Sequence, residues 1–299
     1  MTTTALPNMT RFALRRGRRK AASIVGLGLA ATLALSACSQ GASSESQGGT
    51  AEAMPSAHVH GISRDPGSGK VNLATHEGLF VLQSDARWKR VGPQVDLMGF
   101  AVSGPGTFYS SGHPGAGVDL PAPVGLMKST DAGATWAVLS RGGESDFHAL
   151  TASSRGVMGF DGALGVTSDG KTWSQGGLSA VPRSLASAPD GSRVLATTEQ
   201  GVLSSTDGGG TWAPLPGAPL LLITAWADSK TVVGVTAEET LAVSIDAGLT
   251  WKTDLAKLSS GQAVSASRDK AGALEILVVT DKAVFQSRDN GATLTDLQT

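Results

Sequence analysis

The sequence predicts an all-β fold, a six-bladed β-propeller, and three observations support this prediction. A short string, S-x-D-x-G-x-T-W, recurs along the chain, and its clearest copy is Ser205 to Trp212. The anchoring residues of six successive copies are 48, 37, 39, 39 and 43 residues apart. Helical periodicity is not evident after the first 37 residues. Repeats of about 40 residues that contain four short strands are typical of propeller blades.

Each residue type in the string suits a hairpin turn. The Asp carboxylate accepts hydrogen bonds from N–H groups of its own turn, the Gly supplies a positive φ, and the Thr starts the next strand. The Trp anchors the turn on its blade. The expected structural pairs are Asp131 with Trp136, Asp169 with Trp173, Asp207 with Trp212, and Asp246 with Trp251, followed by a copy in which Asp289 is paired with Leu294. An early copy keeps little more than Asp85 and Trp88.

This string resembles the Asp-box, or BNR repeat, of sialidases, sortilin-type receptors and photosystem-assembly propellers. The resemblance implies the fold, and it implies little about activity, because the same scaffold carries unrelated functions. Residues 57–299 divided among six repeats leave about 40 residues for each blade, which favours six blades over seven.

The first 37 residues have the pattern of a secretory signal peptide. They contain six basic residues, no acidic residue and the apolar run from Ala21 to Leu35, which is short for a membrane-spanning helix. The run ends Leu35-Ser36-Ala37-Cys38, which resembles a bacterial lipobox. The resemblance implies cleavage before Cys38, lipidation of that residue and anchoring at the extracytoplasmic face of the cell membrane. The arginine pairs leave the export route, general or twin-arginine, open.

The composition after the signal limits the possible functions. Cys38 is the only cysteine, so a lipidated mature chain has no thiol for a disulfide or a zinc cage. Residues 38–56 are mainly Ser, Gly, Gln, Ala and Glu, which predicts a flexible linker. Without the six basic residues of the signal, 18 of the 24 Lys and Arg remain against 25 Asp and Glu, a formal charge of −7. This acidity argues against a nucleic-acid partner.

All five histidines fall in the first three repeats, at corresponding places. His58 and His60 begin the innermost strand of the first repeat, and the matching places hold Asp96 and Met98, then Asp146 and His148. A second set follows the second strand of the same three repeats: His76 with Glu77, His113, and Asp161. In a propeller these two places share one face near the central channel, and the repeated turns occupy the opposite face.

Mixed imidazole and carboxylate ligands suit zinc or copper, and a methionine sulfur suits copper. The predicted metal ligands are therefore His58, His60, His76, His113, His148 and Met98. His58 and His60 alone can supply two ligands, since strand side chains alternate with period two. The same residues could bind a sugar or a peptide instead.

A second resemblance covers nearly the whole mature chain. The segments His58 to Ile62, Ala74 to Phe80, Asp96 to Phe100, Ser111 to Pro114 and Asp146 to Leu150 are similar to those of bacterial lipoprotein propellers commonly labelled glycosyl hydrolase or exo-α-sialidase. A sialidase needs three arginines for the substrate carboxylate and a Tyr–Glu nucleophile. Here only Arg183 sits plainly on an inner strand, and the single tyrosine, Tyr109, is expected in the core.

A different glycosidase could use two carboxylates from the set Glu77, Asp96, Asp146 and Asp161. Aromatic platforms for sugar rings are scarce, which weakens that hypothesis. The main hypothesis is a lipid-anchored binding or accessory module with a His and carboxylate site at the channel mouth. The alternatives are a glycoside hydrolase and a protein-docking assembly factor.

Overall fold

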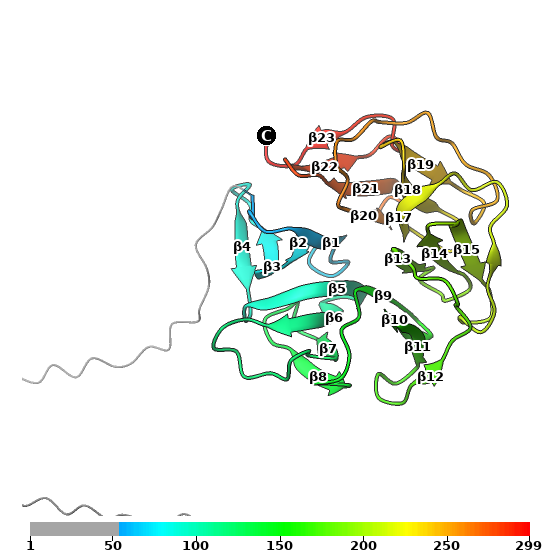
Figure 1. The fold of residues 1–299 in the computed structure, drawn as a ribbon. Helices are drawn as coiled ribbons and strands as arrows, with labels where there is room; N and C mark the ends of the chain where they lie inside the picture. The colour runs from blue at the N-terminus through cyan, green and yellow to red at the C-terminus, as the bar shows by residue number, and fades with distance from the viewer. Residues whose placement is uncertain (1–53) are drawn as a thin grey trace, which may run out of the picture. The chain divides into compact units, whose positions relative to one another are not determined.

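The computed structural model describes residues 54–299, and all its regular structure is β-strand. Its six antiparallel sheets are the blades of a β-propeller, which confirms the predicted fold class (Figure 1). The strands all belong to the compact unit Glu45–Thr299. The predicted signal peptide, Cys38 and nearly all of the linker lie outside the described residues. Between residues 54 and 299 no helix has the length and apolarity needed to cross a membrane.

Each blade is built from one continuous stretch of chain, with its strands in sequence order from the centre outward. The first strands surround the channel and are β1 (Val59–Arg64), β5 (Val95–Gly104), β9 (Ala149–Ser153), β13 (Ser184–Ser187), β17 (Leu221–Trp226) and β20 (Ala263–Arg268). The second strands are β2 (Val71–Thr75), β6 (Thr107–Pro114), β10 (Gly156–Asp161), β14 (Val194–Thr198), β18 (Val232–Thr236) and β21 (Leu274–Val279). The third strands are β3 (Gly78–Leu82), β7 (Leu126–Ser129), β11 (Ala163–Thr167), β15 (Gly201–Ser205), β19 (Leu241–Ser244) and β22 (Val284–Ser287).

Five blades have a fourth, outer strand: β4 (Trp88–Val91), β8 (Ala137–Ser140), β12 (Ser174–Gln175), β16 (Ala213–Pro214) and β23 (Thr295–Asp296). Blade five has three strands, and two isolated bridges, Thr240 with Lys257 and Val243 with Lys252, take the place of the fourth. Four of the second strands, β2, β14, β18 and β21, are buried at every residue. Neighbouring blades cover both of their faces, which explains their nearly continuous apolar sequences.

The ring closes by packing between the first and last blades, which share no strand. Val59 and Ile62 of blade one pack in one cluster with Ala263 and Leu277 of blade six. A partly buried ion pair joins the same two blades: Nη2 of Arg64 donates to Oε1 of Glu275 at 2.9 Å, and Nε of Arg64 donates to the other carboxylate oxygen. Glu275 is only 2% exposed. The ion pair and the apolar contacts between blades one and six therefore close this propeller, whereas many propellers close through a strand shared by the two ends of the chain.

The repeated turns have the hydrogen bonds expected of their residue types. In blade four, Ser205 Oγ donates to Asp207 Oδ1 at 2.8 Å, and the N–H of Thr211 donates to the same oxygen at 2.9 Å. These donors lower the pKa of Asp207 to about 2. The same pattern surrounds Asp131, Asp246 and Asp289, and Thr167 replaces the serine beside Asp169. Trp212 Nε1 donates to the carbonyl of Gly209 at 3.0 Å, which ties the tryptophan to its own turn.

Candidate functional site

Rings of six residues, one from each inner strand, line the channel at successive depths. The pairing with the second strands places the following residues at one depth, here called the waist ring: Ile62, Phe100, Leu150, Leu185, Thr224 and Val264. The waist ring separates a cavity of about 630 Å³ from a second one of about 490 Å³, and its residues line both. The channel therefore has two mouths divided by a mostly apolar constriction.

The larger cavity is lined by four of the six predicted metal ligands, His58, His60, Met98 and His148. Two residues before the waist on each strand, a second ring lines this cavity, here called the upper ring: His60, Met98, His148, Arg183, Leu222 and Gln262. The residues two positions before each upper-ring residue in the sequence are here called the rim: His58, Asp96, Asp146, Val181, Leu220 and Ser260. The upper ring and the rim are thus polar and rich in His and Asp on blades one to three, and more apolar on blades four and five.

Three upper-ring residues lie at β-bulges. The register shifts between Val59 and Gly61, between Leu97 and Gly99, and between Leu221 and Ile223, so His60, Met98 and Leu222 have no paired residue on the second strand. A bulge redirects the side chain of the extra residue. The regular alternation assumed for His58 and His60 is therefore interrupted, although their rings still lie 4.8 Å apart between centroids.

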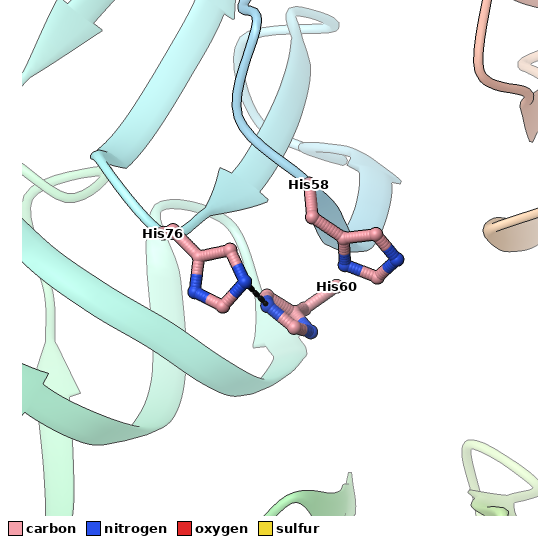
Figure 2. Close-up of side chains that lie close together, drawn as sticks. All are labelled: His58, His60 and His76. Atoms are coloured by element: carbon pink, nitrogen blue, oxygen red, sulfur yellow. Dashed lines mark hydrogen bonds between the residues drawn. The ribbon is translucent and has the colours of Figure 1, made fainter.

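The structure brings His58, His60 and His76 together as one cluster, here called the histidine triad (Figure 2). His58 directly precedes β1, His60 is the second residue of β1, and His76 comes from the turn between β2 and β3. The backbone N–H of His76 lies 3.4 Å from the carbonyl oxygen of His58, which holds the two segments together. One ligand nitrogen from each ring lies within 4.8 Å of the others, and Nε2 of His60 is 3.2 Å from Nε2 of His76.

Asp96 of the neighbouring blade orients one triad ring. Its Oδ1 atom lies 2.9 Å from Nδ1 of His76. Because a carboxylate accepts the proton on Nδ1, the lone pair of a neutral His76 is on Nε2, toward His60. This carboxylate–imidazole arrangement is the usual support of a metal-binding histidine.

Burial, followed by the nearby His76 and His58 rings, lowers the pKa of His60 from 6.5 to about 4. A half-buried imidazole among two others is costly to protonate. His60 is therefore neutral at pH 7 and has a lone pair available for a ligand.

The remaining two histidines gather around a different carboxylate. Oδ2 of Asp146 lies 2.8 Å from Nε2 of His148 and 3.6 Å from Nδ1 of His113. The other oxygen of Asp146 is buried and has no hydrogen-bond partner. The five histidines thus form two groups, the triad on blade one and the Asp146 group on blades two and three. Met98 lies between their upper-ring members.

Two of the candidate catalytic carboxylates lie apart from both groups. Asp161 lines a separate depression of about 200 Å³ together with Phe147 and Trp173. Glu77 is half-buried after the second strand. None of the four candidate carboxylates lines the larger cavity; among the described residues that do, the carboxylate is Glu239, which was not predicted from the sequence. Tyr109 packs in the core between blades, as expected.

No family model and no curated protein matches the sequence. Solved structures do match. A gluconolactonase, XC5397 from Xanthomonas campestris, has a TM-score of 0.58 at 12% identity, over 77% of this chain and 85% of that one. A GH74 enzyme from Niastella koreensis has a TM-score of 0.55 at 17% identity, over 80% of this chain and 37% of that one. YCF48 bound to a D1 peptide has a TM-score of 0.51 at 16% identity, over 83% of this chain and 84% of that one.

These likenesses establish the propeller fold. The chain spans about a third of the length of the GH74 enzyme. The three matched proteins are a lactonase, a glycoside hydrolase and a peptide-bound protein, each less than 20% identical to this chain. At such identities their activities cannot be transferred to this chain.

Proposed function

We propose that this protein is a lipid-anchored, extracytoplasmic binding module that holds one transition-metal ion, copper or zinc, on His58, His60 and His76. The observation that carries the proposal is the 3.2 Å separation of Nε2 of His60 and Nε2 of His76. Two nitrogens that share a tetrahedral zinc ion at 2.0–2.1 Å are about 3.3 Å apart, so this pair needs little movement to share an ion. To bind the ion through Nε2, neutral His60 would carry its proton on Nδ1, as His76 does beside Asp96, so that both Nε2 lone pairs are free.

Three imidazoles leave a fourth coordination position free, as in zinc sites that bind an exchangeable ligand. The triad borders the 630 Å³ cavity through His58 and His60, so this position is accessible from the channel mouth. Met98 lines the same cavity on the adjacent blade and offers a sulfur ligand that favours copper(I).

Metal analysis of the protein purified without a histidine tag tests the proposal. We expect one copper or zinc ion per chain, and His60→Ala and His76→Ala each to weaken binding on the order of 100-fold. His113→Ala is the matched control, because this exposed histidine lies outside the triad. Failure of the wild type to bind either ion, or equal binding by all three variants, would contradict the triad.

Met98 distinguishes the two metals. If its sulfur contacts the ion, Met98→Leu lowers the affinity for copper(I) and leaves that for zinc unchanged, because zinc prefers nitrogen over a thioether. Competition titrations with a copper(I) chelator and a zinc chelator measure the two affinities separately. Equal effects on both ions would exclude a ligand role for Met98.

The anchoring part of the proposal rests on the string that ends at Cys38. Cys38→Ser should abolish incorporation of a labelled fatty acid and move the protein from the membrane fraction to the soluble one. Unchanged membrane association of this variant would contradict lipid anchoring.

The placement of the carboxylates supports binding more than glycoside hydrolysis. Asp96 and Asp146 each contact a histidine, and Asp161 lies in a separate depression. Turnover of a fluorogenic glycoside that is lost in Asp146→Asn would favour the hydrolase instead. Stoichiometric capture of a membrane protein that is unaffected by His60→Ala would favour an assembly factor.

A further inference from the structure

Arg183 occupies the position in blade four that His60 occupies in blade one. Gly61 pairs with Ala74 in the first blade, and Ser184 pairs with Thr197 at the same register in the fourth. The residues just before Gly61 and Ser184 are His60 and Arg183, and both line the larger cavity. In a ring of six blades, the first and fourth lie across the channel from each other (Figure 1). Arg183 and two members of the triad, His58 and His60, therefore line the cavity from opposite sides.

The Arg183 side chain has no partner within residues 54–299. It is exposed, and it makes no hydrogen bond or ion pair with another described residue. By contrast, Arg64 and Arg268, which line the second cavity, pair with Glu275 and Asp228. Arginine is charged at all physiological pH values and presents a planar fork of donors that fits a carboxylate. An unpaired guanidinium in a cavity attracts an anion.

The surroundings of Arg183 favour an organic anion over an inorganic one. Leu185 of the same blade and Leu222 of blade five line the larger cavity together with Arg183. The one carboxylate among the described lining residues, Glu239, accepts a hydrogen bond from the N–H of Ser260 at 3.2 Å. The guanidinium is therefore bordered by large apolar side chains on this side of the cavity.

We infer that the cavity binds an organic carboxylate that bridges the metal and Arg183. One end of the ligand occupies the free coordination position of the ion on the triad. A carboxylate at the other end pairs with the Arg183 guanidinium, and the carbon chain between them contacts Leu185 and Leu222. A cavity of about 630 Å³ is in the usual size range for small-molecule ligands. This inference rests on the proposed metal site and specifies the chemical class of its ligand.

Calorimetric titration with straight-chain dicarboxylates, from malonate to suberate, tests the bridge. The zinc-loaded protein is titrated first, with its zinc content measured before and after. We expect one chain length to bind best, and Arg183→Gln to weaken that binding on the order of tenfold or more, the value of a charge-assisted hydrogen bond. Arg155→Gln is the matched control, because Arg155 is exposed in the turn between β9 and β10 on the opposite face. It should bind like the wild type.

Three results would overturn the inference. Binding that is unchanged in Arg183→Gln removes the arginine from the site. If dicarboxylate binding depends on Arg183 but is equally strong in the zinc-loaded and the metal-free protein, the ligand does not bridge the metal and Arg183. Preference for phosphate over every dicarboxylate changes the ligand class. If the wild type takes up no metal, the metal analysis reports the failure of the proposed function separately, and the bridge fails with it.

Discussion

Nδ1 of His76 lies 2.9 Å from Oδ1 of Asp96, and this contact between two blades leaves the other ring nitrogen of His76 facing His60. Neither residue alone determines the direction of the lone pair. The hydrogen bond fixes the tautomer, and the tautomer determines which nitrogen can bind a metal.

Asp96→Asn should therefore weaken metal binding without removing a ligand. Loss of such a supporting carboxylate costs on the order of 10- to 100-fold in metal affinity. Asp161→Asn is the control, since Asp161 lies away from the triad. Chelator competition measures both affinities, and Asp96→Glu, which keeps the carboxylate, should recover part of the loss. An Asp96→Asn protein with wild-type affinity would show that His76 needs no carboxylate.

The turn aspartates predict a loss of stability in acid. The pKa values of Asp207, Asp246 and Asp289 are lowered from 3.8 to about 2 in the folded protein by the hydroxyl and N–H donors of their own turns. The stabilisation from these groups is complete above the ordinary pKa of 3.8 and is lost as the pH falls toward about 2. The free energy of unfolding should therefore decrease with pH across this window.

Combined Asp207→Asn and Asp246→Asn substitutions should lower the stability at pH 7 and flatten its decrease between pH 4 and pH 2, because a neutral amide cannot titrate. Urea unfolding at several pH values measures both effects. Asp119→Asn is the control, because Asp119 is exposed and lies outside the repeated turns. An equally steep decrease in the double variant would show that other groups govern acid unfolding.

Two arginines line the second cavity, and replacing each by alanine should lower the free energy of unfolding by a different amount, because only Arg64 joins the first and last blades. Arg64→Ala removes two charged hydrogen bonds from Glu275, which is 2% exposed, and should lower the free energy of unfolding by about 2 kcal/mol. Arg268→Ala breaks an ion pair in which both side chains are 36% exposed, and it should cost less than about 1 kcal/mol. Urea unfolding compares them, and equal costs would contradict the role of Glu275 in closure.

The repeated turns made the fold predictable. Each Ser, Asp, Gly and Thr satisfies hydrogen bonds inside its own turn, so the local sequence is sufficient to specify the hairpin. The depth of the histidines in the channel could also be inferred by counting from these turns. Closure of the ring could not, because Arg64 and Glu275 are 211 residues apart and only tertiary packing brings them together.

The composition of the site was predicted less completely. Period-two alternation does not show the bulges at His60 and Met98, since a bulge depends on how the backbone pairs with the next strand. The contact of His76 with Asp96, and of His113 and His148 with Asp146, depends on side-chain directions that spacing does not contain. Arg183 was visible on an inner strand, but its place opposite His60 required the register of both blades.

X-ray absorption fine structure of the metal-loaded protein tests the triad most directly, because it counts the imidazole ligands of the ion. We expect three histidine nitrogens at about 2.0–2.1 Å around zinc in the wild type. We expect two in His76→Ala at saturating zinc, and three in His113→Ala. An ion with fewer than three imidazoles in the wild type, or a spectrum that His76→Ala leaves unchanged, would rule out the triad as the metal site.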